Sequence, residues 1–436
     1  MSSKFHYPLF DAYFKYVEHT EPPMMFHRWS LLPALGAWLG RQYYLPFGDF
    51  RIFPNMYVML MGYPGTRKST AIKLARKIIS DAGYSTFAGD KTSKEKFLMD
   101  LAGMDDDTGE KKRGDTTVNS LMMENLFGSG TGGPAREVFI VADEFNEFMG
   151  NGNLEFISLL GSLWDWDDEN RPFEQRFKNS KSIQIYQPTI SLLGGNTHAN
   201  FAACFPPQSI GQGFLSRLLL VFSEPSGIKI TFPRKPSEEV KAALVDSLVQ
   251  IRGTVHGEAR IEPAAERALD YLYRSFKGLE DMRFQHYSTR RFTHLLKLCM
   301  LCAAARCSVS VSEEDVVLAN TMLSFAEHRM PRALGEFGKA KNADVSDKII
   351  ALLADAPAGE VVKDSDIWKR VSTDLENVEM MQKILQNLIM AQKVQWVGAV
   401  GNSRGGYTIV KKVLKTSAQY VDYSLLIEAP DNLKGM

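Results

Sequence analysis

The chain has little of several features that would place a protein in a narrow class. It contains four cysteines in 436 residues, and 51 basic residues balance 51 acidic ones to a formal net charge of zero. A fold held by disulfides is therefore not indicated, and no global field draws the molecule to nucleic acid or to a membrane surface. No stretch reaches the roughly 18 consecutive apolar residues of a membrane span, and the first residues lack the apolar run of a secretion signal. We therefore expect a cytoplasmic protein without a membrane partner.

Three of the cysteines lie close together, as Cys299, Cys302 and Cys307 in the pattern C-x2-C-x4-C. Such spacing can belong to a metal site, but no fourth ligand is evident and the surrounding stretch 295–307 is largely apolar with helical character. Buried thiols in a helix are therefore the better interpretation.

The length allows two or three domains, and the sequence patterns change along the chain. Continuous apolar runs, typical of strands buried on both faces of a parallel sheet, lie at 56–61, 138–142, 189–193 and 218–222. Helical patterns follow them, and the last third ends in a pattern of three short helices and two strands. The expected fold is α/β, and its expected parts are an N-terminal helical segment (1–50), a core with a parallel sheet (51–235), a helical lid (236–338), a small domain (345–415) and a tail (416–436).

The most specific motif is Gly-Tyr-Pro-Gly-Thr-Arg-Lys-Ser-Thr at 62–70, between the first apolar run and an amphipathic helix at 69–81. At such a strand-to-helix turn, backbone N–H groups wrap anionic phosphates and the helix N-terminus adds partial positive charge. Lys68 would reach the β- and γ-phosphates of ATP, and the Ser69 hydroxyl would hold Mg²⁺. The residues expected to contact the nucleotide are Gly62, Pro64, Gly65, Thr66, Arg67, Lys68, Ser69 and Thr70.

One residue departs from the pattern G-x-x-x-x-G-K-[ST]: Arg67 stands where the last glycine is expected. Gly62 and Gly65 remain, so the turn is feasible. We therefore predict that the backbone at Arg67 is one that a side chain tolerates.

Polar residues follow the second and third apolar runs, at the predicted carboxyl edge of the sheet. Asp143 would bind Mg²⁺ directly or through water, and Glu144 would act as general base toward the attacking water. Two acids after a strand can also simply favour the start of a helix, but the earlier phosphate loop favours the catalytic interpretation. Asn196 would position the water, although an asparagine in a Gly-rich turn is also a good turn former.

Arginines supply the remaining candidates for nucleotide chemistry. Arg217, just before the fourth run, would cross a subunit interface and stabilise transition-state charge, with a surface salt bridge as the alternative. Arg290 or Arg291, at the start of a lid helix, would report on the nucleotide, and the sequence neither chooses between them nor requires either. The acidic run 165–169 is expected to be a solvated loop rather than a second metal site, and His198 an ordinary loop histidine.

Two features point to DNA. Alternating residues at 173–177 and 182–187 predict a hairpin whose turn carries Lys178 and Lys181, which suit phosphates rather than bases. The small domain has the element order of a winged helix, with Arg404 in its wing. Each has a plainer interpretation, a solvated hairpin tip and a domain that contacts proteins.

Taken in order, the phosphate loop, the Asp-Glu strand, the Asn-bearing strand, the arginine and the helical lid resemble the AAA+ class of ATPases. More closely, Phe26-His-Arg-Trp-Ser through Lys68-Ser69, with Pro54-Asn55 and the Thr-Arg-Lys-Ser variant, is similar to a family of phage and prophage replication ATPases. The likeness covers roughly residues 20–335, and it makes a basic residue at position 67 a family feature. The resemblance implies hydrolysis of ATP with Mg²⁺. It also implies a hairpin like the one that superfamily 3 and minichromosome-maintenance helicases project into a central channel.

These observations lead to one principal expectation. We expect a homo-oligomeric ring, a hexamer, that acts as an ATP-dependent DNA helicase or translocase on single-stranded or forked DNA, in replication within a phage-infected or prophage-bearing bacterial cell. The first alternative is an ATP-switched origin-binding or helicase-loading factor that does not unwind DNA. The second is a remodeller of protein partners with no role on DNA.

Overall fold

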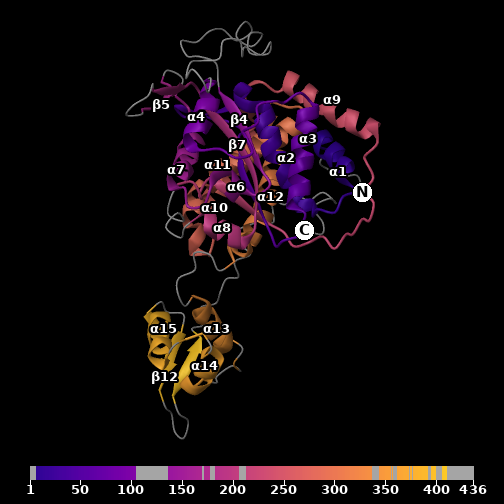
Figure 1. Ribbon diagram of the computed structural model, residues 1–436. Coiled ribbons are helices and arrows are strands. Elements are labelled where there is room, and N and C mark those ends of the chain that lie inside the picture. Colours follow the sequence, from indigo (N-terminus) through magenta and orange to yellow (C-terminus); the bar gives the residue numbers. More distant parts are fainter. Residues whose placement is uncertain are drawn as a thin grey trace. The chain divides into compact units, whose positions relative to one another are not determined.

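The computed structural model describes most of the chain in two compact units (Figure 1). The first contains the described residues through Gly335, and the second those from 343 onward. The described ranges are 6–104, 136–168, 171–176, 182–205, 213–335 and 343–409, the last with gaps at 355, 357–360, 373, 376, 391–393 and 399–404.

A sheet of four parallel strands forms the centre of the first unit. In order across the sheet, its strands are β4 (Glu137–Ala142), β7 (Thr189–Asn196), β3 (Tyr57–Met61) and β8 (Leu218–Phe222). Every residue of β3, β7 and β8 is buried, because helices cover both faces of the sheet. The predicted α/β class and its parallel sheet are confirmed.

Residues 86–88 extend this sheet beyond β4. The N–H of Ala88 donates to the carbonyl of Phe139 over 3.0 Å, and the N–H of Phe139 donates to the carbonyl of Thr86 over 2.9 Å. From β3 the chain therefore passes to one side of the sheet and later crosses back to β8 on the other side.

Helices on the two faces fix the sheet between them. α2 (Met24–Leu39) and α3 (Lys68–Asp81) lie on one face, where Ile72 packs against Gly195 of β7. α6 (Phe145–Met149) and α7 (Leu154–Leu163) lie on the other face, where the Tyr57 hydroxyl donates to the Leu160 carbonyl over 2.9 Å. The other α-helices described in this unit are α1 (Pro8–Val17), α4 (Lys94–Ala102), α8 (His198–Cys204), α9 (Glu238–Thr254), α10 (Pro263–Ser275), α11 (Gln285–Ala305) and α12 (Glu313–Leu334).

The expectation of an N-terminal helical segment over 1–50 is wrong at its end. There, β1 (Tyr43–Phe47) and β2 (Phe50–Ile52) form an antiparallel hairpin. Pro46 removes a backbone donor that a helix would need, and Gly48, at φ 63°, supplies the left-handed residue of the turn. β1 also pairs in parallel with the short β9 (Gly257–Glu258).

The hairpin that precedes β7 is present. β5 (Phe173–Gln175) and β6 (Ile183–Ile185) pair antiparallel. Lys178 and Lys181, the lysines predicted at its turn, lie outside the described residues.

The second unit has its own core. Its elements are α13 (Ala343–Ala354), α14 (Asp364–Val371), α15 (Val378–Met390), β12 (Val394–Val397) and β13 (Gly406–Ile409). Val362 and Tyr407 exchange two backbone hydrogen bonds of 2.9 Å, which adds a short third segment to the β12–β13 pair. The fully buried core side chains include Ile349, Ile367 and Met381. Arg404 lies outside the described residues.

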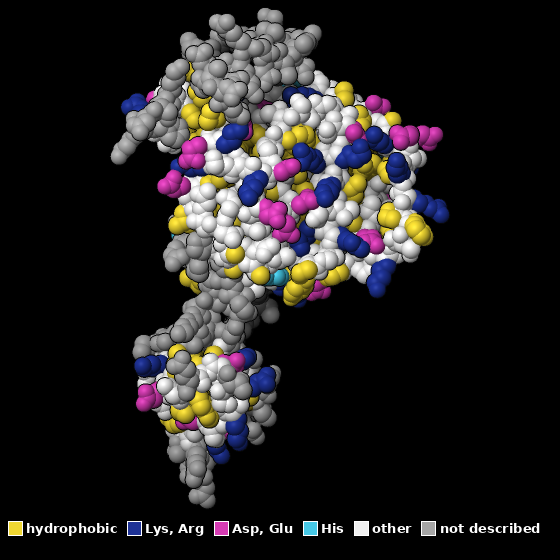
Figure 2. All heavy atoms as spheres, in the orientation of Figure 1, with side chains coloured by type: hydrophobic (Ala, Val, Ile, Leu, Met, Phe, Trp, Pro, Cys, Tyr) yellow, Lys and Arg dark blue, Asp and Glu magenta, His cyan; other side chains and the backbone are white. Residues whose placement is uncertain are grey.

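The cysteines form no disulfide, and neither sign of charge dominates the surface shown in Figure 2. All four cysteines are free, and Cys204, Cys299 and Cys302 are buried whereas Cys307 is partly exposed. Figure 2 shows basic and acidic side chains interspersed over the face it presents. Among the described helices, none is both long and apolar enough to cross a membrane.

Candidate functional site at the carboxyl edge of the sheet

The strand register brings the predicted residues to one edge of the sheet. Met61, the last residue of β3, pairs with Asn196, and Ala142, the last residue of β4, pairs with Gly194. A Cβ atom on Gly195 would lie 2.5 Å from the Asp143 carbonyl oxygen, so this close approach requires glycine. The 62–67 loop, the Asp143–Glu144 pair and Asn196 therefore lie at neighbouring strand ends.

The 62–67 loop closes around the ammonium of Lys68. Lys68 Nζ donates to the carbonyls of Gly62 and Tyr63 over 2.9 and 3.1 Å, and it lies 3.2 Å from Thr66 Oγ1. Lys68 is 6% exposed. Burial lowers the pKa of Lys68, and the nearby negative charge of Glu144 opposes that shift. The loop thus holds one cation where the backbone turns into α3.

Arg67 adopts a backbone conformation that favours glycine. Its φ is 62° and its ψ is 28°, in the left-handed region, which costs an ordinary residue on the order of 1 kcal/mol. We predicted a backbone that a side chain tolerates, and the one found is a conformation that side chains adopt rarely and at this cost. Arg67 Nε lies 2.5 Å from Glu21 Oε2. Glu21 also accepts the N–H of Ile230 over 2.9 Å. That hydrogen bond, followed by the contact with Arg67, lowers the pKa of Glu21.

The two acids that follow β4 have separate partners. Asp143 Oδ2 lies 2.9 Å from Lys73 Nζ, one helical turn after Ser69 in α3. Glu144 Oε2 accepts from Asn200 Nδ2 over 3.1 Å. Sequence reasoning missed Lys73 and Asn200. The first could have been found, because residues 69 and 73 share one face of a helix, whereas the second depends on how α8 packs.

Ser69 and Asp143 can supply oxygen ligands to Mg²⁺, on the condition that Lys73 first leaves Asp143. The described residues contain no group of three or more His, Cys, Asp or Glu that could hold a metal ion. A Mg²⁺ bound with a nucleotide needs only one or two carboxylates, since phosphates and water complete its octahedron. Asp143 and Ser69 can supply protein oxygens. Lys73, whose side chain is 70% exposed, would first have to leave Asp143.

Asn196 is buried with one half of its amide unpaired. It has no exposed surface. Its Oδ1 accepts the N–H of Thr197 over 3.0 Å, but its Nδ2 has no hydrogen-bond partner among the described residues. Leaving a buried donor unpaired costs about 1–3 kcal/mol. Such a donor at the edge where Lys68 lies is suited to an anionic ligand.

His198 is more than a loop histidine. It begins α8, and its ring centroid lies 5.3 Å from that of Tyr63 in the 62–67 loop. Its Nε2 lies 2.7 Å from the carbonyl oxygen of Arg332 near the end of α12. His198 therefore links the loop to the helix that ends the first unit.

Arg217 lies at the opposite edge of the sheet. It precedes Leu218, which pairs with Tyr57 at the start of β3. Arg217 Nη1 donates to the Gly213 carbonyl over 2.7 Å, and its Nη2 is 3.6 Å from Asp165 Oδ2. Burial, followed by the nearby Arg290, lowers the pKa of Arg217. It is therefore remote from the 62–67 loop of its own chain.

Neither lid arginine contacts that loop. Arg290 Nη1 lies 2.9 Å from Asp165 Oδ2. Arg291 is 3% exposed and its Nε donates to Glu327 Oε1 over 2.7 Å, between α11 and α12. Arg291 makes its contact between α11 and α12 and Arg290 at the amino edge of the sheet, so the idea that either one reports on the nucleotide gains no support.

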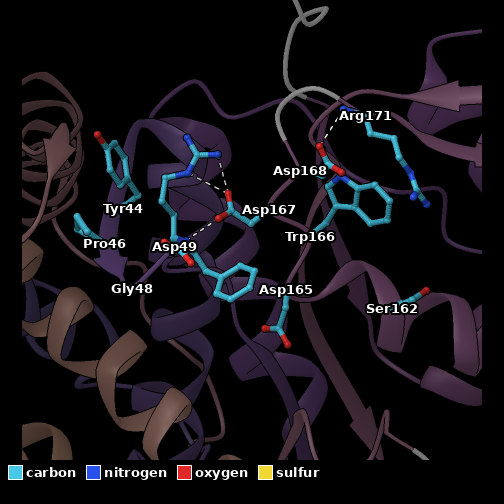
Figure 3. A pocket seen from close by; sticks show the side chains of 12 residues that line it. Tyr44, Pro46, Gly48, Asp49, Ser162, Asp165, Trp166, Asp167, Asp168 and Arg171 are labelled. Atoms are coloured by element: carbon cyan, nitrogen blue, oxygen red, sulfur yellow. Dashed lines mark hydrogen bonds and ion pairs between the residues drawn. The ribbon is translucent and has the colours of Figure 1, made fainter.

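The acidic run at 165–169 is not simply a solvated loop. The Asp167 side chain is 7% exposed and accepts from Arg51 Nη2 over 2.6 Å and from the Arg51 backbone N–H over 2.5 Å. Arg41 Nη2 lies 3.5 Å from the same carboxylate. The expectation is wrong for Asp167 because its partners lie more than a hundred residues earlier in the chain. Figure 3 shows Asp167 beside a hollow lined from the β1–β2 turn and from the stretch that follows α7.

The first unit is therefore an α/β fold with a parallel sheet. At the carboxyl edge of that sheet an enclosed lysine lies at one strand end, and two carboxylates and a buried amide lie at the neighbouring strand ends. No family model matches the chain, and no match appears among curated proteins.

Proposed function

We propose that the first unit binds ATP at the carboxyl edge of its sheet and hydrolyses it. The observation that carries this proposal is the pair formed by the enclosed Lys68 ammonium and the unpaired Nδ2 of Asn196, at adjacent strand ends. Both are donors, and both suit the γ-phosphate. The crossing of the chain from one side of β3 to the other adds support, because ligands of open α/β sheets bind at such switch points.

Each residue at this edge is assigned one role in the reaction. ATP would supply the phosphoryl group, with Mg²⁺ to neutralise its charge, and Ser69 and Asp143 would hold that ion. Lys68 and the backbone N–H groups of the 62–67 loop would bind the phosphates. Glu144 would accept the proton of the attacking water, and the amide of Asn200 would hold the Glu144 carboxylate in place.

Arg217 extends the proposal to an oligomer. Its position at the amino edge prevents it from acting on the nucleotide of its own chain. An arginine supplied by a neighbour is worth about 10³–10⁵ in rate where such residues operate. We therefore assign Arg217 to the site of an adjacent subunit, as the resemblance to AAA+ ATPases implies.

Mg²⁺-dependent release of phosphate from ATP tests the hydrolase. Lys68→Ala should lower the rate by about 10² or more, the scale for removing a preorganised charge. Lys77→Ala is the matched control, because Lys77 lies on the same helix in an exposed pair with Asp81. Equal rates in the two variants, with both folded, would remove the proposal.

The work that ATP drives is proposed to be translocation on single-stranded or forked DNA, as a helicase of phage replication. The β5–β6 hairpin supports this, because it leads directly into the strand that ends in Asn196. The second unit adds support, since its three helices and β-hairpin follow the order of a winged helix.

One observation favours the alternative, a loading or origin-binding factor without unwinding activity. The described exposed positions of α15 carry Glu379 and Lys383, whose charges cancel, the polar Gln382 and Gln386, and the apolar Val378 and Ile389, which are 43% and 37% exposed. A helix with this surface suits a protein contact better than a phosphate backbone, which favours clustered lysine and arginine.

Strand displacement on forked DNA separates the two functions. A helicase should displace the strand with ATP, and both Lys68→Ala and the double variant Lys178→Ala/Lys181→Ala should lose that activity. ATP hydrolysis that DNA stimulates without displacing a strand would instead establish the loading factor.

A further inference from the structure

We propose that Glu21, in the loop between α1 and α2, is a positioning residue for the 62–67 loop. It binds the side chain of Arg67 and so supports the left-handed backbone on which the shape of that loop depends. Glu21 itself would not touch the nucleotide. The proposal rests on the binding of ATP at the carboxyl edge, and it names a residue that acts on that site from another part of the chain.

The left-handed residue at position 67 determines how the loop presents its backbone N–H groups. Arg67 has a φ of 62° and a ψ of 28°, and α3 begins directly after it, at Lys68. A left-handed residue beside a helical one turns successive N–H groups toward one side, where they form a concave site for an anion. The Ala71 N–H donates to the Arg67 carbonyl over 3.3 Å, so the N–H groups of residues 68–70 precede the first turn and have no helical partner. The strained residue therefore lies where the phosphates are proposed to bind.

This conformation is not supported by the residue type or by a cap. Within the same loop, the other position with positive φ is Gly65, at 82°, where glycine adopts it freely. Among the described residues, only Arg67, Gln187 and Cys307 have positive φ without being glycine. Arg67 makes no side-chain capping hydrogen bond to α3. Its support must therefore come from outside the loop.

The Glu21 carboxylate supplies a contact from outside. Arg67 Nε lies 2.5 Å from Glu21 Oε2. The other oxygen, Oε1, accepts the Ile230 N–H over 2.9 Å. The Glu21 side chain is 17% exposed. The Ile230 N–H, followed by Arg67, lowers the pKa of Glu21, so the carboxylate is charged at neutral pH. With both oxygens engaged, it can hold the guanidinium in one orientation.

The backbone of Glu21 is itself held in place. Pro22 and Pro23 follow it, and both are buried. Proline has a fixed φ and restricts the residue before it to extended conformations. The Glu21 carbonyl also accepts from the Ser226 hydroxyl, in the segment that follows β8. A rigid support loses little conformational freedom when it makes its contact, so this pair can position Arg67 even though partly exposed ion pairs add little to stability.

The support should be visible in ligand binding. A ligand that requires one conformation of a loop binds more weakly in proportion to the fraction of molecules that have left it. The left-handed region is disfavoured for an ordinary residue by an amount that corresponds to roughly tenfold in an equilibrium. Loss of the Glu21 contact should therefore weaken phosphate binding by up to about tenfold, and only where residue 67 has a side chain.

A double-mutant cycle tests the proposal, with the Kd of ATP measured by calorimetry in the absence of Mg²⁺. Glu21→Gln keeps an oxygen for the Ile230 N–H and removes the charge that meets Arg67. It should raise the Kd by about tenfold in the natural chain, but by less than about twofold in an Arg67→Gly chain, because glycine adopts φ near 62° without support. Arg67→Ala should resemble Glu21→Gln, since alanine has neither the contact with Glu21 nor the freedom of glycine.

Glu18→Gln is the matched control. It makes the same chemical change at an exposed residue just after α1 that forms no ion pair with a described residue, and the Kd should stay within about twofold of the natural value. Thermal unfolding checks that each variant is folded. Arg67→Ala leaves the Glu21 contacts with Ser226 and Ile230 in place, so it gives the same test if Glu21→Gln unfolds.

Three outcomes would overturn the role of Glu21. They are an unchanged Kd in Glu21→Gln, an equal rise in the natural and Arg67→Gly chains, and binding by Arg67→Ala as tight as by the natural protein. Each of them leaves ATP binding itself intact. A natural protein that binds no ATP would instead remove the proposed function, and this inference with it.

Discussion

The two edges of the parallel sheet hold their polar groups in contrasting conditions. At the amino edge, Asp167 is enclosed by Arg41 and Arg51, and the buried Lys297 donates to Asn55 Oδ1 over 2.7 Å. At the amino edge these groups are paired within the fold, although Arg217 Nε is buried there without a hydrogen-bond partner among the described residues and burial lowers the pKa of Lys297. At the carboxyl edge, the Nδ2 donor of Asn196 has no hydrogen-bond partner among the described residues. At the carboxyl edge the fold leaves a buried polar group unpaired, as is expected where a ligand binds.

The largest effect is expected from breaking the amino edge. Asp167→Asn should lower the free energy of unfolding by about 3–5 kcal/mol, because it removes one charge of a buried network and leaves Arg51 and Arg41 without it. Urea unfolding measures this. Asp270→Asn, at an exposed pair with Arg274, should change stability by about 0.5 kcal/mol or less. A similar small change in both variants would contradict the contrast between the edges.

The carboxyl edge should respond in the opposite way. Asn196→Ala should lower the rate of ATP hydrolysis by about 10²–10³ while stability changes by about 1 kcal/mol or less, since its Nδ2 makes no bond in the fold. The control is Asn320→Ala on α12, which removes a buried amide whose Oδ1 accepts from Arg291 Nη2 over 2.9 Å and whose Nδ2, like that of Asn196, has no hydrogen-bond partner among the described residues. That variant should lose stability without a specific loss of rate. The reverse pattern would assign Asn196 to folding alone.

Lys297 allows a test by pH. Burial lowers its pKa to about 7, whereas in the unfolded chain the pKa is about 10.4. Between these values the unfolded chain binds the proton and the folded chain does not, so stability rises with pH. From pH 7 to pH 9 this contribution should reach about 2 kcal/mol. The difference between the natural protein and Lys297→Met isolates it, and parallel curves for the two proteins would show that Lys297 stays charged.

The sequence predicted the features that depend on residues close together in the chain. The strand at β3, the turn after it and the helix α3 could be predicted because their signals are local, an apolar run, glycines and helical spacing. The position of Asn196 at the same edge as the 62–67 loop was anticipated only through the rule that parallel strands end at one edge, and the pairing of Met61 with Asn196 was not predicted. The burial of Asp167 could not be predicted, because it depends on arginines from another part of the chain.

The β1–β2 hairpin shows a second kind of limit. The apolar pattern of α2 runs on toward Tyr43, and periodicity alone does not distinguish a buried helix from a strand in so short a stretch. Pro46 and Gly48 were the local signs of the turn. Asn200 was missed for a different reason, since its contact with Glu144 depends on how α8 packs beside α6.

The smallest effect is expected at Arg67, where the carboxyl edge bears strain in its own backbone. Arg67→Gly should stabilise the protein by roughly 0.5–1 kcal/mol, because glycine adopts φ near 62° without the steric cost of a Cβ atom. The variant also loses the contact with Glu21, but the Arg67 side chain is 56% exposed, and such pairs contribute little.

Arg67→Ala separates these two terms, because it loses the contact with Glu21 and keeps the strained backbone. Thermal unfolding of the three proteins should therefore place the glycine variant above the natural protein and the alanine variant at or slightly below it. If glycine and alanine behave alike, the backbone at position 67 carries no strain. If instead glycine stabilises the fold and slows ATP hydrolysis, the arginine is retained for what its side chain does at the loop, at a cost in stability.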